Sequence, residues 1–407
     1  CIFKRPMDFW EVFSGKDNKM IILIKGGEVF APEPLGVKDI LILNGKIGSI
    51  SDPDEISING LDVEIIDASD KKIIPGFIDS HVHILGGGGE GGPSTRAPEI
   101  RIEEIISSGV TTLIGCLGTD GSTRHMESLL AKAKGLEIEG ITTYIFTGSY
   151  QVPVATLTKS VMTDLIFIDK VIGAGEIALS DHRSSQPTFE EFARLASECR
   201  VGGMLGGKAG ILHCHIGAGQ RKLEMLFRLI TETEIPPTQI IPTHTNRSKD
   251  LLKEGISFIL QGGYIDLTAN IDPEDENNGP SIASSIQMCR ENQASLSHIT
   301  VSSDSNGSLP IFDAKGNFMG LTIATQKSLM KNFRHLIHRN ILSLEEAVNI
   351  FSYNPARFYK FHEKGEIKER KDADLLLLDN EFNLDGSIIK GKIAMLSAKL
   401  ITGGTFS

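Results

Sequence analysis

The sequence predicts an α/β protein in which a parallel (β/α)8 barrel is joined to a small β-sandwich domain built from both ends of the chain. Between Ile73 and Asn306, eight strand-like apolar runs alternate with helix-like amphipathic segments, which is typical of repeated βα units. Short β-rich runs separated by turn residues fill 20–75 and return after 360. An open doubly wound sheet is the alternative arrangement of the central units.

Domain boundaries follow from these patterns. The barrel is expected to span 76–359, the β-sandwich 20–75 with 360–407, and residues 1–19 form an N-terminal extension of unknown role. A chain of 407 residues exceeds the size at which a single core stops growing, which favours two domains. The first runs, MIILIKGGEVF, DILILNGKIGSI and VEIIDASDKKII, are predicted to form hairpins.

Polar residues at the ends of the central runs favour the barrel over the open sheet. Nearly every run finishes in His, Asp, Glu, Arg, Tyr or Thr, and a barrel gathers its catalytic groups at the C-terminal ends of its strands. An open sheet would concentrate them at one switch point. The eight runs are KIIPGFIDSHVHI, TTLIGCLGT, TTYIFTGSY, EIALSDHR, GILHCHIG, QIIPTHTNR, YIDLTANI and HITVSSDSNG.

Segments between the runs carry helix signals. Thr188 with Glu191 and Ser343 with Glu346 have the spacing of a capping box, in which two side chains satisfy the first free N–H groups of a helix. Apolar residues at helical spacing from 329 to 337 indicate a helix face packed on a sheet.

Composition excludes several classes of partner. A net charge of -11 argues against nucleic acid or anionic membrane, because both require clustered Lys and Arg, and no stretch approaches the roughly 18 apolar residues of a membrane span. Five scattered cysteines without a CxxC pair predict reduced, mostly buried thiols. The first residues lack the features of a signal peptide, so a cytoplasmic location is expected.

Histidines at strand ends indicate a metal site. His81 and His83 lie at the end of the first run, and alternate residues of a strand point the same way, so two imidazoles can bind one ion. His215, His244 and Asp304 follow runs five, six and eight. Four histidines and a carboxylate in these positions are difficult to explain as core packing.

A pair of metal ions would need a bridging carboxylate. Glu176 in GEIALSDHR is the one acidic residue placed within a strand rather than at a loop tip. Two ions about 3.5–4 Å apart can activate water and polarise a carbonyl, with Asp304 taking a proton from the water and passing it to the leaving amine. His213 is the competing ligand on run five, but it would point deeper, so we assign it a supporting or core position.

PGFIDSHVH, the five ligand positions and the closing KGEIKERKDADLLLLD resemble the amidohydrolase superfamily, whose members join a metal-bearing (β/α)8 barrel to a β-sandwich built from both termini. The resemblance runs from about Met20 to the C-terminus. More specific motifs are similar to the isoaspartyl dipeptidases within it, which are omega peptidases that remove an N-terminal β-linked aspartate. These motifs are HILGGGGEGGPSTR, LGTDG, FTGSY, SDHRS, GGMLGGKAG, PTHTNR and SSDSNGS.

The resemblance implies hydrolysis of β-aspartyl dipeptides to aspartate and an amino acid with two divalent metal ions, of which zinc suits imidazole and carboxylate ligands best. His81 and His83 would hold one ion with Asp304, and His215 and His244 the other. Cobalt, manganese or iron are the alternatives to zinc. Relatives often form symmetric oligomers, so a homo-oligomer is expected.

The resemblance also implies a binding site for the aspartyl part of the substrate. Glu90 and Ser308 would meet its free α-amino group, and Gly88 and Thr119 its α-carboxylate, while Tyr150 would polarise the scissile carbonyl. The glycine run at 86–92 resembles a phosphate loop but lacks the following Lys-Ser/Thr, and we interpret it as a substrate loop.

Arg183 and Arg247 are implied to receive the carboxylate of the leaving amino acid, a role that suits the guanidinium fork. The chemistry of the substrate agrees with this assignment. A zwitterionic dipeptide carries one ammonium and two carboxylates, so its pocket needs about one acid and more than one base, and Glu90 with the two arginines supplies them.

One position departs from the family pattern. Isoaspartyl dipeptidases commonly bridge their ions with a lysine carboxylated by CO2, but no lysine occurs between Val171 and Arg183, and Glu176 stands there instead. Glutamate is shorter, and an apparent extra residue in GAGE would supply the reach. Occupancy of the second metal site stays open.

Two other functions compete with this hypothesis. One is an amidohydrolase of cyclic amides, such as a dihydroorotase or a hydantoinase-like enzyme, against which the pocket of one acid and two arginines argues. The other is a catalytically silent scaffold that kept the barrel. Because residues suited to metal binding occur at all ligand positions, the sequence favours the enzyme.

Overall fold

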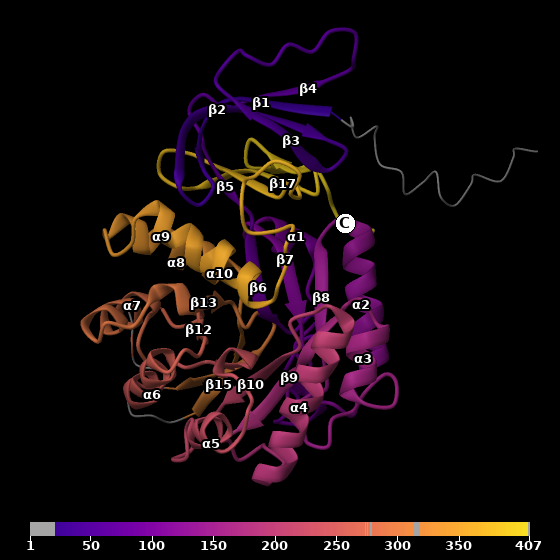
Figure 1. Ribbon diagram of the computed structural model, residues 1–407, viewed down its shortest axis with the longest axis vertical. Coiled ribbons are helices and arrows are strands. Elements are labelled where there is room, and N and C mark those ends of the chain that lie inside the picture. Colours follow the sequence, from indigo (N-terminus) through magenta and orange to yellow (C-terminus); the bar gives the residue numbers. More distant parts are fainter. Residues whose placement is uncertain (1–20, 273, 275, 277–278, 313–317, 406–407) are drawn as a thin grey trace, which may run out of the picture.

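A computed structural model describes residues 21–272, 274, 276, 279–312 and 318–405. The extension predicted for residues 1–19 lies outside the described residues. Figure 1 shows the two regions of the molecule: strands from both ends of the chain, indigo and yellow, lie together at the top, and a parallel sheet with helices fills the rest.

The upper region is a nine-stranded mixed sheet. Its strands follow the order β19-β18-β17-β16-β5-β1-β2-β3, and β4 pairs with β1. The predicted use of both termini is confirmed, although the strands form one connected sheet where we predicted a sandwich. The strands are β1 (Ile21–Phe30), β2 (Pro34–Leu43), β3 (Lys46–Ser51), β4 (Glu64–Asp67), β5 (Lys72–Pro75), β16 (Leu375–Leu378), β17 (Leu384–Ile389), β18 (Lys392–Leu396) and β19 (Lys399–Leu400).

Two of the three predicted hairpin runs pair as expected, and the third does not. β1, β2 and β3 are successive antiparallel neighbours, and the β2–β3 turn places Asn44 and Gly45 at φ 49° and 82°, the conformation that a tight hairpin turn requires. The run VEIIDASDKKII was wrongly predicted as a hairpin, because β4 and β5 both pair with β1 in parallel. β4 pairs with residues 22–25 of β1, and β5 pairs with residues 28 and 29, so the two strands follow one another along the same side of β1.

All eight central runs contain parallel strands. Six form one ladder in the order β11-β10-β9-β8-β7-β6, and β12 pairs with β13 in a second. The strands are β6 (Phe77–Val82), β7 (Val110–Gly115), β8 (Thr142–Thr147), β9 (Val171–Leu179), β10 (Ile211–Ile216), β11 (Ile240–Thr243), β12 (Ile265–Thr268) and β13 (Ile299–Ser302).

The predicted closed barrel is not formed as a continuous ladder. A single parallel bridge between Val82 and Ser305 links the chain after β13 to β6. Side-chain hydrogen bonds span the gap between β11 and β12, where the two ladders are not paired. Asp266 on β12 accepts from Thr243 on β11 and also from Ser302 on β13. Polar side chains therefore fill the place where the ladder is interrupted.

Helices cover the outside of the parallel strands (Figure 1). The capping boxes at Thr188 and Ser343 are confirmed at the starts of α4 and α9, and the apolar stripe predicted over 329–337 lies in α8. None of the helices in the described part of the chain is long and apolar enough to cross a membrane. The helices are α1 (Ile102–Ile106), α2 (Met126–Glu139), α3 (Val161–Phe167), α4 (Phe189–Gly206), α5 (Glu224–Glu232), α6 (Lys249–Leu260), α7 (Ile282–Glu291), α8 (Lys327–His338), α9 (Leu344–Val348) and α10 (Asn354–Phe358).

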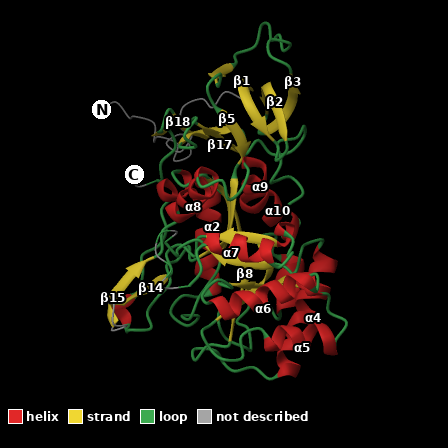
Figure 2. Ribbon diagram, turned by 90° about the vertical axis from the view of Figure 1, so that its left-hand side faces the viewer, coloured by secondary structure: helices red, strands yellow, loops and turns green. Residues whose placement is uncertain are grey.

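The main core lies between the parallel strands and these helices. Phe77 of β6 packs against Phe333 of α8 and Phe351, with ring centroids 4.9 and 5.4 Å apart. A hairpin of β14 (Ser308–Phe312) and β15 (Phe318–Ile323) projects from the body of the molecule (Figure 2). Four of the five cysteines fall in the described residues, and all four are buried and free, as predicted.

A buried ion cluster ties the two regions together. Nζ of Lys364 lies 2.8 Å from Asp372, 2.5 Å from Asp374 and 2.9 Å from the hydroxyl of Thr142 at the start of β8. Lys364 is only 5% exposed. Burial opposes its charge, but the two aspartates raise the pKa of this lysine. The cluster is therefore charged, and each charge depends on its partners.

We expect Lys364→Met to destabilise the protein by about 3–5 kcal/mol, because it leaves two aspartates near each other without their buried cation. The apparent melting temperature of the purified protein measures this loss. Lys253→Met is the control, since the pair of Lys253 with Asp250 is exposed and contributes little. Equal melting temperatures for the two variants would contradict the structural role of Lys364.

Candidate metal centre

All six side chains predicted as metal ligands meet in one buried cluster. They are brought together because the carboxyl ends of the parallel strands share one edge of the fold. His81 lies in β6, Glu176 in β9 and His215 in β10, while His83, His244 and Asp304 follow β6, β11 and β13. None of the six is more than 6% exposed.

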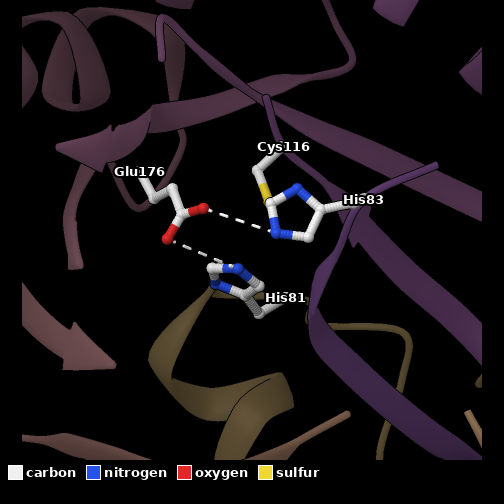
Figure 3. A group of neighbouring side chains, drawn as sticks. All are labelled: His81, His83, Cys116 and Glu176. Carbon is white, nitrogen blue, oxygen red and sulfur yellow. Dashed lines mark hydrogen bonds and ion pairs between the residues drawn. The ribbon is translucent and has the colours of Figure 1, made fainter. Parts of the chain in front are cut away.

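Two of the histidines and both carboxylates make one half of the cluster. His81 Nε2 lies 3.5 Å from an oxygen of Glu176 and 3.5 Å from an oxygen of Asp304. His83 Nε2 lies 3.5 Å from the other oxygen of Glu176 and 3.2 Å from Asp304. Figure 3 shows both imidazoles pointing toward the glutamate.

The other two histidines lie on the far side of the same glutamate. His215 Nδ1 is 3.0 Å, and His244 Nε2 3.7 Å, from Oε2 of Glu176. The carboxylate of Glu176 therefore contacts all four imidazoles. This central position is what a bridging ligand requires.

The cluster fits divalent metal ions. Metal–ligand bonds of about 2.1 Å in tetrahedral geometry place donor atoms about 3.4 Å apart, close to the separations around Glu176 and Asp304. His81 Nε2 and Glu176 Oε1 are buried and have no hydrogen-bond partner, which an ion between them would supply. Groups able to hold a metal include His81 with His244 and Asp304, and Glu176 with His215 and His244.

Hydrogen bonds orient His81 and His244 through their second ring nitrogen. Nδ1 of His81 lies 2.8 Å from Nε2 of His213, and Nδ1 of His244 lies 2.6 Å from the hydroxyl of Thr268. Such contacts fix the ring so that its other nitrogen faces the metal. His213 stacks on Phe146 and lies outside the ligand groups, in the supporting position that we predicted.

Cys116 was missed by sequence reasoning. Its Sγ lies 3.9 Å from His83 Nδ1 and within 4.8 Å of the ligand atoms of His81, His83 and Glu176 (Figure 3). The signal for it was its place in the sequence, because Cys116 directly follows β7 and so lies at the same strand edge as the ligands. Because its neighbours in TTLIGCLGT are mostly apolar, Cys116 resembled an ordinary buried core residue.

The charges of the cluster suit metal binding. Burial opposes ionisation of Glu176, but the charge of His81 and hydrogen bonds from His215 and His244 hold the pKa of this carboxyl well below its usual range. Burial and the nearby charge of Arg247 lower the pKa of His244 to about 3. An anionic carboxylate and a neutral imidazole are the forms that bind a metal ion, so Glu176 and His244 have the binding form, whereas the raised pKa of His81 means that an ion would displace its proton.

Local backbone irregularities aim these ligands. His244 and Asp304 adopt left-handed conformations, with φ of 60° and 52°, which are uncommon outside glycine and concentrate at functional sites. In the β9–β10 ladder, Leu212 pairs with Ala174 but Cys214 pairs with Ile177, so β9 contains one extra residue at this point. This bulge lies next to Glu176, within the GAGE segment.

The residues predicted to bind substrate lie beside the cluster. The carboxylate of Glu90 accepts a hydrogen bond from the Thr119 hydroxyl at 2.9 Å and pairs with Arg183 at 3.1 Å. Tyr150 is buried, its hydroxyl lies 2.9 Å from His215 Nδ1, and the guanidinium of Arg183 lies over its ring.

The remaining three predicted residues complete this group. Arg247 Nη1 lies 3.2 Å from His215 Nε2, and no carboxylate in the described residues pairs with this guanidinium. Gly88 adjoins Ser308, because a Cβ at Gly88 would lie 3.1 Å from the serine Cβ. The φ of 75° at Gly88 also favours glycine. Of the seven predicted residues, Tyr150, Arg183 and Arg247 contact His215 directly, and Glu90 and Thr119 are linked to the cluster through Arg183.

Arg124 is a second residue that sequence reasoning missed. Its guanidinium is 5% exposed and donates hydrogen bonds to the carbonyl oxygens of Leu85, Gly88 and Ala97. Leu85 and Ala97 lie on either side of the glycine-rich loop and Gly88 lies within it, so Arg124 holds the backbone of this loop in place. No local motif indicates this contact, because its partners lie 27 to 39 positions earlier in the chain.

Comparisons with known proteins agree with this geometry. Residues 208–394 match the model of the amidohydrolase family. The crystal structure of the β-aspartyl dipeptidase of Fervidobacterium islandicum AW-1 in complex with the β-Asp-Leu dipeptide is 46% identical, with a TM-score of 0.89 over 95% of this chain and 98% of that chain. A second structure of that enzyme is 44% identical, with a TM-score of 0.86 over 94% and 98%.

More distant relatives act on other compounds. The dihydroorotase of Listeria monocytogenes serotype 4b (strain F2365) is 25% identical over 91% of this chain and 92% of its own length. The D-hydantoinase of Thermus sp. is 17% identical, with a TM-score of 0.66 over 94% of this chain and 97% of that chain, and shows the fold alone.

Fold and site together define a hydrolytic enzyme of the metal-dependent amidohydrolase class. The 46% identity to a β-aspartyl dipeptidase, over nearly the whole of both chains, places this chain in a particular family within that class. The chain belongs to the β-aspartyl (isoaspartyl) dipeptidase family of the amidohydrolase superfamily.

We expect Glu176→Ala to lose at least one of two metal ions per chain and most activity. Two divalent ions a few ångströms apart repel strongly, and neutral imidazoles do not offset that repulsion as a shared carboxylate does. Metal analysis of the purified variant measures the loss, with Glu345→Ala on the exposed start of α9 as the control. Two ions per chain and near-normal turnover would exclude the bridging role.

The same reasoning predicts that metal loading of the wild-type enzyme is indifferent to bicarbonate, because the carboxylate of Glu176 is encoded rather than formed from CO2. Activation of the metal-free enzyme by bicarbonate would instead indicate a carboxylated lysine.

Proposed function

We propose that the enzyme hydrolyses β-aspartyl dipeptides and releases aspartate and an amino acid. The observation that carries this proposal is the set of charged side chains beside the metal cluster: Glu90 and the guanidinium groups of Arg183 and Arg247, with a second carboxylate, Asp181, already bound to Arg183 and His215. It matches a substrate with one ammonium and two carboxylates. The similarity to a β-aspartyl dipeptidase solved with β-Asp-Leu supports the same substrate.

In this proposal two ions, zinc being the best suited, occupy the cluster. His81, His83 and Asp304 would hold one ion and His215 and His244 the other, with Glu176 within reach of all four imidazoles. When bound, such ions activate water and polarise the scissile carbonyl.

The protein supplies the proton transfers. Asp304 lies at the edge of the cluster, 3.2 Å from His83 Nε2, and its carboxyl has a lowered pKa, because neighbouring histidines outweigh the effect of burial. We assign it the role of general base, which takes a proton from the attacking water and delivers it to the leaving amine. Tyr150 keeps its proton, since burial and the charge of Glu176 raise the pKa of its hydroxyl, and it donates a hydrogen bond to the carbonyl oxygen.

Substrate recognition is assigned to the residues around Glu90. Glu90 and Ser308 receive the α-amino group, and Gly88 and Thr119 the α-carboxylate of the aspartyl part. Arg247 is the stronger candidate for the leaving-group carboxylate, because Arg183 already pairs with Asp181 and Glu90.

Hydrolysis of a cyclic amide is the alternative function, favoured by the similarity to dihydroorotases. Dihydroorotate has no ammonium group for Glu90 to accept. At 25% identity this relationship is also far weaker than the one to the β-aspartyl dipeptidase.

A panel of substrates tests the proposed function. We expect turnover of β-Asp-Leu. N-acetyl-β-Asp-Leu and dihydroorotate should be poor substrates because they lack the free ammonium that Glu90 requires. α-Asp-Leu should be poor because its scissile carbonyl is not β-linked. Zinc-loaded enzyme and a ninhydrin or chromatographic assay of released aspartate suffice for the dipeptides. Comparable turnover of the acetylated dipeptide, or faster turnover of dihydroorotate, would overturn the proposal.

For Arg247→Lys we expect KM for dipeptides to rise by a larger factor than kcat falls. Lysine keeps the charge but loses the bidentate contact with the leaving-group carboxylate, which is made equally in the ground and transition states. Steady-state kinetics on β-Asp-Leu measures both constants, with Arg221→Lys, whose side chain is exposed, as the control. An unchanged KM would remove Arg247 from the pocket.

A further inference from the structure

Asp181 is a buried carboxylate that no sequence pattern singled out. It lies two residues beyond the end of β9, and its side chain is only 5% exposed. Three groups surround it: the imidazole of His215, the guanidinium of Arg183 and the backbone of Gly217. A Cβ at Gly217 would lie 2.6 Å from Asp181 Oδ2, so the absence of a side chain there lets the carboxylate approach His215.

We propose that Asp181 is a positioning residue that fixes both a metal ligand and a substrate-binding arginine, and so couples the metal centre to the binding pocket. The part that concerns Arg183 rests on the proposed function. The part that concerns His215 does not.

The contact with His215 identifies which nitrogen faces the metal. Nδ1 of His215 lies 3.0 Å from the shared carboxylate of Glu176, and Nε2 lies 3.0 Å from Asp181 Oδ2. A metal ligand must present a lone pair, so we assign Nδ1 as the ligand atom and the proton to Nε2. Asp181 Oδ2 is the nearest acceptor for that proton, because Arg247 Nη1 and Arg183 Nη2, at 3.2 and 3.4 Å from Nε2, have no lone pair to accept it. A carboxylate in this position fixes the tautomer and the ring orientation and raises the basicity of the ligand nitrogen.

The contact with Arg183 is bidentate. Nε of Arg183 donates to Asp181 Oδ1 at 3.0 Å and Nη2 donates to Oδ2 at 2.8 Å, while the backbone N–H of Arg183 donates to Oδ1 at 2.8 Å. Two parallel hydrogen bonds hold the guanidinium plane in a fixed direction. Nη1 remains turned toward Glu90, at 3.1 Å. The same carboxylate therefore sets the directions of His215 and Arg183.

Charge explains why this residue is an aspartate. The carboxylate accepts hydrogen bonds from an imidazole, a guanidinium and a backbone N–H at once, so both oxygens act only as acceptors. An asparagine of the same shape would replace one acceptor with a donor. That donor would face N–H groups of Arg183 at either position, and at the Oδ2 position it would also face His215. In either orientation the contact with His215 loses the negative charge of its partner.

The test compares Asp181→Asn with Arg183→Gln in the zinc-loaded, full-length enzyme. We expect Asp181→Asn to weaken the binding of one of two zinc ions per chain by about 10–100-fold, because its ligand His215 loses its carboxylate partner. Zinc released to a graded series of chelator concentrations measures this affinity without any substrate. Arg183→Gln keeps Asp181 beside His215 and should retain both ions like the wild type.

The matched control removes a buried carboxylate that lies away from the metal cluster. Asp164 of α3 is fully buried and accepts hydrogen bonds from Thr147, Leu157 and Thr158, but it contacts no metal ligand, so Asp164→Asn should retain both ions. Should Asp181→Asn not fold, as judged by circular dichroism, Asp181→Ser removes the same contacts with a smaller side chain. Wild-type zinc affinity in the Asp181 variants, or equal loss in Arg183→Gln or Asp164→Asn, would overturn the role at His215.

Kinetics tests the coupling to the pocket. With both ions kept in place by excess zinc, Asp181→Asn should still show a higher KM for β-Asp-Leu, approaching that of Arg183→Gln, since the guanidinium is no longer held in direction. A wild-type KM under these conditions would refute the coupling. If no variant and no wild-type enzyme cleaves β-Asp-Leu, the proposed function fails, while the zinc measurement still decides the role of Asp181 at His215.

Discussion

The concentration of charge around Glu176 is the constraint on which the rest of the structure depends. Four imidazoles and two carboxylates are buried within a few ångströms of one another, and buried charges are stable only where they are paired or bind metal. Parallel strands make such a concentration possible, because their carboxyl ends share one edge. The helices, the terminal sheet and the Lys364 cluster then hold those strands in place.

Much of the fold could be predicted because its signals are local. Apolar runs, capping boxes and the HxH pattern depend on residues a few positions apart, and each of the eight predicted runs contains a strand. The errors concern pairing between distant segments. Whether β4 and β5 pair with each other or with β1 depends on long-range contacts. So does closure between β13 and β6, where Ser303 donates to Asp79 on β6.

The same distinction holds for the site. Residues at strand ends, such as His215 and Asp304, follow from position in the sequence together with the family resemblance. Cys116 also follows a strand, but the apolar residues around it made it look like part of the core. Arg124 was missed because its partners lie 27 to 39 positions earlier in the chain. Asp181 stands in the motif SDHRS, but its contact with His215 spans 34 positions, which the motif does not reveal. Supporting residues of a site are therefore harder to predict than the groups they support.

Glu176 illustrates how backbone geometry can compensate for side-chain length. A carboxylated lysine reaches farther from its strand than a glutamate does, so a direct replacement would leave the carboxylate short of the cluster. The extra residue of β9 lies at this point of the β9–β10 ladder, and a bulge bends the strand and redirects its side chains. In this structure Glu176 reaches all four imidazoles.

The pocket beside the cluster is already paired before any substrate enters. Glu90 pairs with Arg183, and Arg183 with Asp181, whereas Arg247 has no carboxylate partner among the described residues. A zwitterionic dipeptide can take over these pairings, because its ammonium replaces Arg183 at Glu90 and its carboxylate supplies the partner that Arg247 lacks. A substrate without the ammonium would have to leave the Glu90–Arg183 pair intact or break it without compensation. Under the proposed function, the Glu90–Arg183 ion pair would favour zwitterionic substrates, because a ligand without an ammonium group would not compensate for breaking it.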